Sequence, residues 1–356
     1  MASVDYKKEL DELIEILIEE DGSDLHLSVG SHPVIRVSGS LLPLSKKPVL
    51  TEDDTKGFAE AMLNEPQMER FTNEHEIDYS YSYKDGKRFR GNCFFQSGTI
   101  SSALRYIPNN IRTLTDLQLP PILESFSKRQ QGFFLCVGPV GQGKSTTLAA
   151  LIQLINETRA EHIVTIEDPV EFVYTPKKSL IDQREVRTDT ADFGVALHSA
   201  FRQDVDVILV GEMRGRETIS TAVTAAETGH LVFSTLHTNN AAQTIDRIID
   251  TFPAGQQDQI RLQLSGSLLG IFSQRLIPRI QGGLVPSYEL LINTPAVSNL
   301  IRERRTHEIQ TVIETGLEQG MIDMNRSLVE LVQKGEITVE NAFAYSLNPK
   351  GLERLM

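Results

Sequence analysis

Hydrophobic residues near the start of the chain recur with the period of a helix. They are separated by three or four positions and so share one face: Leu10, Leu13, Ile14, Leu17 and Ile18. The Asp21-Gly22 pair predicts the end of this helix. We therefore expect an amphipathic helix that packs one face against a core.

The next stretch has the shorter period of strands. The predicted strands are Leu25–Val29, Val34–Val37, Tyr79–Tyr83, Arg88–Phe95 and Ser101–Ile107. Asp85-Gly86 indicates a hairpin with a type I′ turn. A second helical segment, residues 56–71, is interrupted by Pro66. Residues 1–112 are expected to form a small α+β domain, followed by a proline-bearing connector over 113–131.

Strands and helices alternate in the second half, as a parallel sheet requires. Apolar runs predict buried strands at Gly132–Val137, His162–Ile166, Val205–Val210 and Leu231–Thr235. Residues 146–155 have helical spacing, and the pattern from Pro295 onward is mostly helical. We expect residues 132–356 to form an α/β domain with C-terminal helices.

A phosphate loop joins the first of these strands to its helix. Residues 138–145 match the pattern G-x-x-x-x-G-K-[ST], and strand, loop and helix are the context that this motif needs. Lys144 is expected at the β- and γ-phosphates of ATP, and the Ser145 hydroxyl at Mg²⁺. The nucleotide-binding positions are Gly138, Pro139, Val140, Gly141, Gln142, Gly143, Lys144, Ser145 and Thr146.

Acidic residues follow two further strands. Glu167 and Glu171 come after His162–Ile166, and Glu212 comes after Val205–Val210. Ligands of open α/β sheets bind at the carboxyl ends of the strands, so these acids should converge on the phosphate loop. We expect Glu212 to hold Mg²⁺, with Glu167 or Glu171 as the base that positions water. Taken singly, each acid is also explained as a solvated loop residue or a helix cap.

Two histidines bracket the strand Leu231–Thr235. Either His230 or His237 has the chemistry to donate a hydrogen bond to the γ-phosphate and so report its presence. A surface or capping role is equally consistent with the sequence.

Arginines occupy two strands of the first domain. Arg88 and Arg90 share a face because strands have a two-residue period, and Arg105 lies on the following strand. Exposed strand arginines most often serve solubility. In a ring-shaped motor, an arginine donated by a neighbouring subunit accelerates hydrolysis by roughly 10³ to 10⁵.

Composition narrows the function classes. The formal charge of −13, from 35 basic and 48 acidic residues, argues against a nucleic-acid partner. Cys93 and Cys136 both lie in apolar runs, form no C-x-x-C pair and are expected in the core of a protein from a reducing compartment. Apolar runs stay below the roughly 18 residues of a membrane span, so we expect a soluble, cytoplasmic protein without direct membrane insertion.

Several longer motifs resemble one family. They are Thr165–Phe172, similar to its Asp box; Ile208–Arg214, similar to its atypical Walker B; Ala225–Thr238, similar to its His box; and Gly22–Leu27, Gln183–Val186 and Asp246–Asp250. In this order the set resembles the type IV pilus retraction ATPases, the PilT and PilU family, within the secretion ATPase superfamily. The resemblance spans nearly the whole chain.

The resemblance implies a fold, an assembly and partners. The family has a PAS-like N-terminal domain and a RecA-like ATPase domain, and forms a homohexameric ring. It implies a cytoplasmic motor held at the inner membrane through a pilus platform protein, with a paralogous retraction ATPase as a further partner. It also places Arg90 and Arg105 at the positions of arginine fingers that act on a neighbouring subunit.

Two departures from the family pattern stand out. Val140 and Gln142 replace the usual threonine and serine of the phosphate loop. Backbone N–H groups do most of the phosphate binding, so we expect binding to be retained. In the C-terminal motif at 296–303, Val297 and Ser298 replace the isoleucine and arginine of the family pattern. In the family, this segment is associated with retraction.

Three alternatives remain open. An extension or secretion ATPase of the same superfamily typically carries a four-cysteine zinc insert, which two cysteines cannot supply. A RecA-type helicase is disfavoured by the acidic charge. An accessory ring subunit that hydrolyses ATP poorly is distinguished only by measured phosphate release.

Overall fold

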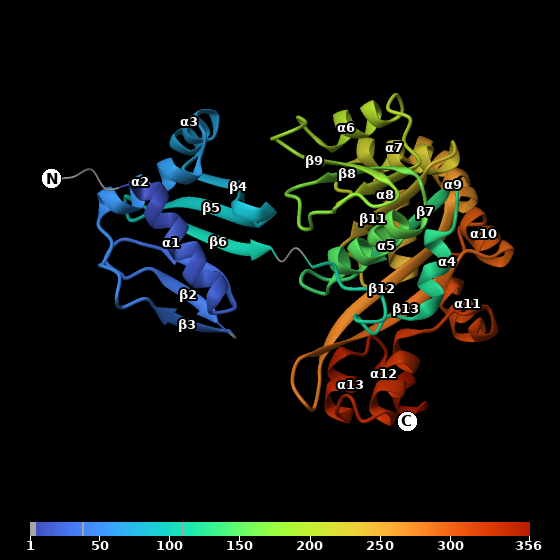
Figure 1. Ribbon diagram of the computed structural model, residues 1–356. Helices are drawn as coiled ribbons and strands as arrows, with labels where there is room; N and C mark the ends of the chain where they lie inside the picture. The colour runs from blue at the N-terminus through green and yellow to red at the C-terminus, as the bar shows by residue number, and fades with distance from the viewer. Residues whose placement is uncertain (1–4, 38, 108–109) are drawn as a thin grey trace. The chain divides into compact units, whose positions relative to one another are not determined.

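The chain divides into two compact units, each with its own sheet (Figure 1). The computed structural model describes residues 5–37, 39–107 and 110–356. One unit comprises Met1–Asn110 with Glu171–Val173, and the other Ile111–Val170 with Tyr174–Met356.

The first unit contains a six-stranded antiparallel sheet with the spatial order β3-β2-β1-β6-β5-β4. Its strands are β1 (Gly22–Leu27), β2 (Val34–Val37), β3 (Ser40–Pro43), β4 (Glu76–Ser82), β5 (Arg88–Gln96) and β6 (Thr99–Ile107). Asp85 and Gly86, between β4 and β5, have φ of 57° and 70°. Positive φ at both positions is what a type I′ turn requires, so the predicted hairpin is confirmed.

Three helices complete this unit: α1 (Tyr6–Glu19), α2 (Glu52–Met62) and α3 (Glu65–Glu74). The predicted apolar face of α1 is confirmed, with Leu10, Leu13, Ile14 and Leu17 buried. The single interrupted helix predicted over 56–71 is instead two helices. Pro66 lies in the first turn of α3, where a missing N–H costs nothing, and Asn64 caps that turn together with Gln67.

The second unit contains a seven-stranded sheet with the order β13-β12-β7-β11-β10-β8-β9. Neighbouring strands are parallel except for β12 and β13. The strands are β7 (Gly132–Val137), β8 (His162–Glu167), β9 (Leu180–Glu185), β10 (Val207–Val210), β11 (Leu231–Leu236), β12 (Leu268–Pro278) and β13 (Leu284–Ile292). Every residue of β7, β10 and β11 is buried, as expected for central strands of a parallel sheet.

Helices flank this sheet and follow it to the end of the chain (Figure 1). They are α4 (Glu124–Ser127), α5 (Lys144–Thr158), α6 (Phe193–Ala200), α7 (Arg216–Glu227), α8 (Ala241–Asp250), α9 (Ala254–Ser267), α10 (Pro295–Arg302), α11 (Ile309–Thr315), α12 (Met324–Gln333), α13 (Val339–Tyr345) and α14 (Pro349–Glu353). The helical character predicted from Pro295 onward is confirmed. Ile277 and Val285, near the β12–β13 turn, pack in a separate small core with Leu328 of α12.

Each unit buries one free cysteine, as the sequence predicts. Cys93 lies on β5 and Cys136 on β7. Burial raises the pKa of both thiols, that of Cys136 to about 12.

A buried acid also lies in the second unit. Glu289 on β13 is 3% exposed, and its carboxyl accepts a hydrogen bond from the Ala241 N–H at the start of α8 at 2.9 Å. Burial raises its pKa to about 7, and the nearby Asp323 and Glu314 carboxylates act in the same direction.

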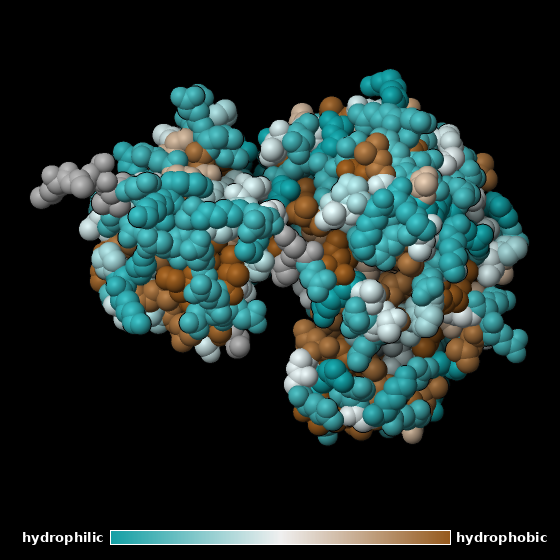
Figure 2. All heavy atoms as spheres, in the orientation of Figure 1, coloured by the Kyte–Doolittle hydropathy of each residue, from teal (hydrophilic) through white to brown (hydrophobic). Residues whose placement is uncertain are grey.

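Polar residues cover most of the visible surface, and hydrophobic residues show over β2 and β3 (Figure 2). Leu41 and Leu42 of β3 are 53% and 46% exposed. None of the helices in the described part of the chain combines the length and apolar character that a membrane span requires.

Candidate nucleotide site

The phosphate loop follows β7 and ends in the first turn of α5. This helix begins at Lys144, two residues before the predicted start at residue 146. Gly138, Gly141 and Gly143 have φ of 145°, 76° and 77°, in the region that favours glycine. A Cβ at Gly138 would lie 2.4 Å from the carbonyl oxygen of Gln274, so only glycine fits there. No side chain caps α5, which leaves its first N–H groups directed at the loop. This is a cradle for a phosphate chain.

The Lys144 side chain lies inside this loop and is buried. Its Nζ donates to the carbonyl oxygens of Gly138 at 2.9 Å and Pro139 at 2.8 Å. The same nitrogen lies 3.3 Å from Nδ1 of His237. The loop backbone therefore holds the ammonium group where a bound phosphate would meet it.

Strand register brings the other predicted groups to the same edge. Leu135, Ser234, Val210 and Ile166 form one row across β7, β11, β10 and β8. The four parallel strands therefore end together, and the residues that follow them meet at this edge.

Glu212 and His237 lie next to each other there. Glu212 pairs with Arg214 at 2.6 Å, and its second carboxylate oxygen lies 3.6 Å from Nε2 of His237. Burial lowers the pKa of the His237 imidazole, and the Lys144 ammonium lowers it further, while the Glu212 carboxylate opposes both. Lys144, His237 and Glu212 thus form a chain of contacts in which the imidazole is neutral at neutral pH. From these partners we assign the ring proton to Nε2.

Glu167 and Glu171 differ in their surroundings. Glu167 ends β8, is 8% exposed and accepts a hydrogen bond from the Thr165 hydroxyl at 2.7 Å. Glu171 lies in the following loop and is partly exposed. Glu167 is therefore the more buried of the two carboxylates.

His230 precedes the N-terminal end of β11, whereas the phosphate loop lies at the C-terminal ends of the strands. Its carbonyl oxygen accepts a hydrogen bond from the N–H of Gly132, the first residue of β7, and its ring contacts Phe201. The six residues of β11 separate it from His237, roughly 20 Å along a strand. The structure thus brings His237, but not His230, to the phosphate loop of the same chain, because the two histidines flank opposite ends of β11.

The arginines Arg90 and Arg105 lie in the first unit, directly opposite each other on β5 and β6. Arg90 is exposed, and the Arg105 side chain is 67% exposed. The Arg105 Nε donates to Asp24 of β1 at 2.8 Å.

Strand β12 supports the phosphate loop through contacts that the sequence pattern did not predict. The Gln274 amide donates to the Gln142 carbonyl oxygen at 2.7 Å and accepts from the Thr147 hydroxyl at 2.6 Å. The side-chain oxygen of Gln142 accepts from the Leu276 N–H at 2.7 Å. The residue that departs from the family pattern thus ties the loop to the sheet, whereas Val140 is 79% exposed. The signal available in the sequence was a glutamine inside an otherwise largely apolar run.

Oxygen donors suited to Mg²⁺ are present at the loop edge. Ser145 lies in the first turn of α5, and the Glu212 side chain is 16% exposed. Among the described residues, no group of three or more His, Cys, Asp or Glu forms a metal-binding cluster.

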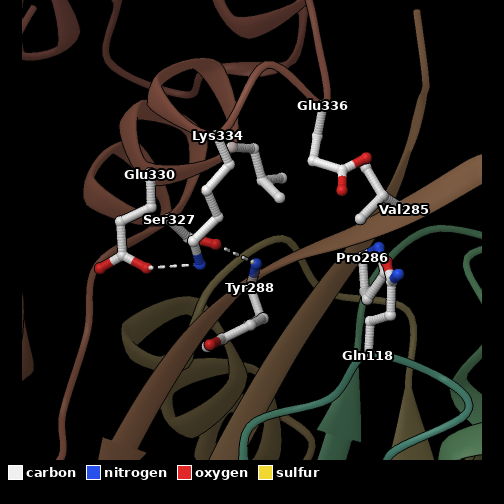
Figure 3. A pocket seen from close by; sticks show the side chains of 9 residues that line it. Gln118, Val285, Pro286, Tyr288, Ser327, Glu330, Lys334 and Glu336 are labelled. Carbon is white, nitrogen blue, oxygen red and sulfur yellow. Dashed lines mark hydrogen bonds and ion pairs between the residues drawn. The ribbon is translucent and has the colours of Figure 1, made fainter. Parts of the chain in front are cut away.

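Two hollows of this unit lie at different places relative to the predicted site. One, of about 400 Å³, opens beside His237 and includes Arg214, Thr238 and Arg247 in its lining. The other, of about 230 Å³, lies between β13 and α12, where the Tyr288 N–H donates to Ser327 and Lys334 pairs with Glu330 (Figure 3). None of the predicted site residues lines the second hollow.

Comparison with known proteins identifies the family. Residues 109–285 match the family described as type II/IV secretion system protein. The chain is 44% identical to the type IV pilus retraction ATPase PilT of Pseudomonas aeruginosa, over 94% of this chain and 97% of that protein. It is 40% identical to the type IV pilus ATPase PilU of the same organism, over 98% of this chain and 91% of that protein.

A solved structure agrees over the whole length. The crystal structure of the pilus retraction motor PilT with bound ADP superposes with a TM-score of 0.91 and 45% identity, covering 97% of this chain and 99% of that one. The expected α/β fold with a smaller N-terminal domain is therefore confirmed. The chain belongs to the PilT and PilU family of type IV pilus retraction ATPases.

Proposed function

We propose that this ATPase assembles as a homohexamer and couples Mg²⁺-dependent ATP hydrolysis to pilus retraction. The observation that carries the proposal is the contact chain from Lys144 through His237 to Glu212 at the mouth of the phosphate loop. Such a chain links the γ-phosphate position to the carboxylate on the metal side.

The loop binds and orients the substrate. Its N–H groups and the α5 N-terminus hold the phosphate chain, and Lys144 exchanges the Gly138 and Pro139 carbonyls for phosphate oxygens. Ser145 and Glu212 would hold Mg²⁺, which would supply positive charge against the β- and γ-phosphates.

Hydrolysis then needs a base and further positive charge. Glu167 accepts the proton of the attacking water, the water oxygen bonds to the γ-phosphorus, and the bond to the β-phosphate oxygen breaks to release ADP and phosphate. Glu171 is the alternative base. Arg90 and Arg105 of a neighbouring subunit stabilise the developing charge, which exposed guanidinium groups can reach. His237 senses the loss of the γ-phosphate.

The released contacts drive a switch between subunit arrangements, and the ring passes this motion to a platform protein of the inner membrane. The motor therefore works on the cytoplasmic side, held at the membrane through that partner. A paralogous retraction ATPase is a further partner.

Phosphate release by the hexameric fraction from size-exclusion chromatography tests the proposal. Lys144→Ala and Glu212→Gln should each lower kcat by about 10²-fold or more. Lys128→Ala, at the residue that follows α4 and with a side chain 73% exposed, is the matched control. Unchanged turnover in either site variant would exclude this mechanism.

Mixed rings test the action between subunits. Rings of Arg105→Ala and Lys144→Ala protomers should regain turnover that neither variant has alone, because some interfaces then combine an intact loop with an intact arginine. A wild-type hexamer that binds ATP but releases phosphate no faster than Lys144→Ala would instead fit an accessory ring subunit.

A further inference from the structure

A row of charged residues crosses the sheet of the first unit. Arg36 of β2 is opposite Asp24 of β1, Asp24 is opposite Arg105 of β6, and Arg105 is opposite Arg90 of β5. These four strands are neighbours in the sheet, in the order β2-β1-β6-β5. Residues directly opposite each other point to the same face, so the four side chains form one charged row.

Asp24 is the acid of this row and its most buried member. The residue is 7% exposed, whereas the Arg105 side chain is 67% exposed. One carboxylate oxygen accepts from the Arg105 Nε at 2.8 Å, and the other accepts from the Ser23 hydroxyl at 2.7 Å. Burial acts to raise the pKa of Asp24, but the hydrogen bonds from Ser23 and Arg105 outweigh it and hold the pKa below its usual range. The ionised Asp24 carboxylate therefore holds the Nε end of the exposed Arg105 guanidinium in place.

The atom used for this contact matters. A guanidinium carries one hydrogen on Nε and four on its two terminal nitrogens. Because Asp24 takes the Nε hydrogen, the terminal nitrogens at the exposed end keep theirs for another acceptor. Phosphate oxygens bind such a terminal fork well.

Asp24 also offsets a repulsion. Arg90 and Arg105 are directly opposite each other, and like charges in that arrangement destabilise a sheet. A carboxylate on the other side of Arg105 draws its guanidinium toward β1 and away from Arg90. The two arginines can then face one anion without first being driven apart.

We propose that Asp24 is a positioning residue for ATP hydrolysis: it fixes Arg105 through Nε so that the terminal nitrogens face the triphosphate of a neighbouring subunit. This inference depends on the proposed trans-acting role of Arg105. It gives a function to Gly22–Leu27, a family motif that the nucleotide site itself does not use.

A double-mutant cycle on the full-length hexamer tests it, with kcat and KM for ATP measured in Asp24→Asn, Arg105→Ala and the double variant. Arg105→Ala should lower kcat by at least about 10³-fold. Asp24→Asn should lower kcat by about 10- to 100-fold with little change in KM, because the guanidinium is present but misplaced. The double variant should be no slower than Arg105→Ala alone.

Two further variants separate positioning from simple charge or stability. Asp78→Asn removes a carboxylate from β4 of the same sheet, where its partner is Asn92, and should leave kcat unchanged. Asp24→Glu keeps the charge on a longer arm and should remain slow. Recovery of full activity in Asp24→Glu would mean that Asp24 only neutralises charge, which overturns the proposal.

The outcomes distinguish this inference from the proposed function. If Arg105→Ala leaves kcat unchanged, the trans-acting arginine itself fails. If Arg105→Ala is slow but Asp24→Asn is not, or if the two effects multiply in the double variant, only the positioning role fails. Should Asp24→Asn not assemble, Ser23→Ala takes its place in the cycle: a several-fold loss that vanishes in the Arg105→Ala background supports the proposal, and a multiplicative loss overturns it.

Discussion

The side-chain oxygen of Gln142 lies 2.7 Å from the backbone nitrogen of Leu276, which ties the tip of the phosphate loop to β12. A serine at this position is too short to make the same contact. The departure from the family pattern therefore exchanges a small hydroxyl for a tether to the sheet.

Removing that tether should weaken nucleotide binding. Gln142→Ser leaves the Leu276 N–H without this acceptor, and a lost hydrogen bond of this kind costs about 1–2 kcal/mol. We expect the Kd for ATP, measured by calorimetry, to rise about 5- to 30-fold. Gln153→Ser, on the adjoining helix α5 with its side chain bonded to Glu157 and Asn156, is the control. An unchanged Kd in Gln142→Ser would show that the tether does not hold the loop in its binding shape.

Gly138 should not tolerate even alanine. The new Cβ would meet the Gln274 carbonyl oxygen at 2.4 Å in a backbone conformation with φ of 145°. We expect Gly138→Ala to abolish measurable ATP binding and to destabilise the second unit by more than about 2 kcal/mol. Gly255→Ala, on α9 with open space around it, should instead stabilise by up to about 1 kcal/mol. Thermal unfolding followed with and without ATP compares the two, and normal binding by Gly138→Ala would contradict the expectation.

ATP turnover should have an acid limb set by His237. Its pKa lies below the ordinary value of about 6.5, so the neutral ring persists at neutral pH and protonates only as the pH falls through that lowered value. The stability contributed by the neutral ring is fully present above about 6.5 and is lost over the same acid range. A protonated His237 would be repelled by the positive charges of Lys144 and Arg214 and attracted by the carboxylate of Glu212.

The pH dependence of kcat/KM between pH 5 and 8 measures this limb. His237→Gln should be slower at every pH and should lose the limb, because glutamine does not titrate. An identical acid limb in that variant would assign the titration to another group.

Glu289 should make the second unit less stable as the pH rises. Its carboxyl has a pKa of about 7 in the folded protein against about 4.3 in the unfolded chain. Stability is therefore fully present below about 4.3 and declines until the pH passes about 7. Denaturation midpoints at several pH values should fall across this window, and Glu289→Gln should flatten the change. A steeper change in the variant would count against the assignment.

Features carried by a few adjacent residues could be predicted from the sequence. The phosphate loop, its strand and its helix are contiguous, and the Asp85-Gly86 turn depends on two neighbouring residues. The acids at the ends of β8 and β10 could be placed because parallel strands end at one edge.

Features that depend on pairing between distant segments could not be predicted. Gln274 contacts Gln142 across 132 residues, and Arg105 contacts Asp24 across 81. No periodicity reports such a contact. Strands β3, β9, β12 and β13 also went unpredicted. The apolar runs of β12 and β13 do not distinguish strand from helix, and β9, which is mostly polar, has no apolar run at all.

His230 shows a different limit. In the sequence it brackets β11 together with His237, which suggests a shared site. The two histidines flank opposite ends of β11, so they are separated by the length of that strand although they are close in sequence.

The two cysteines, one in each unit, make thiol chemistry a probe of motion in this protein. Both thiols are buried with raised pKa values, so maleimide reagents should spare them in the native fold and react only when β5 or β7 becomes accessible. Fluorophores attached to newly introduced surface cysteines can therefore follow the working ring without removal of either native cysteine.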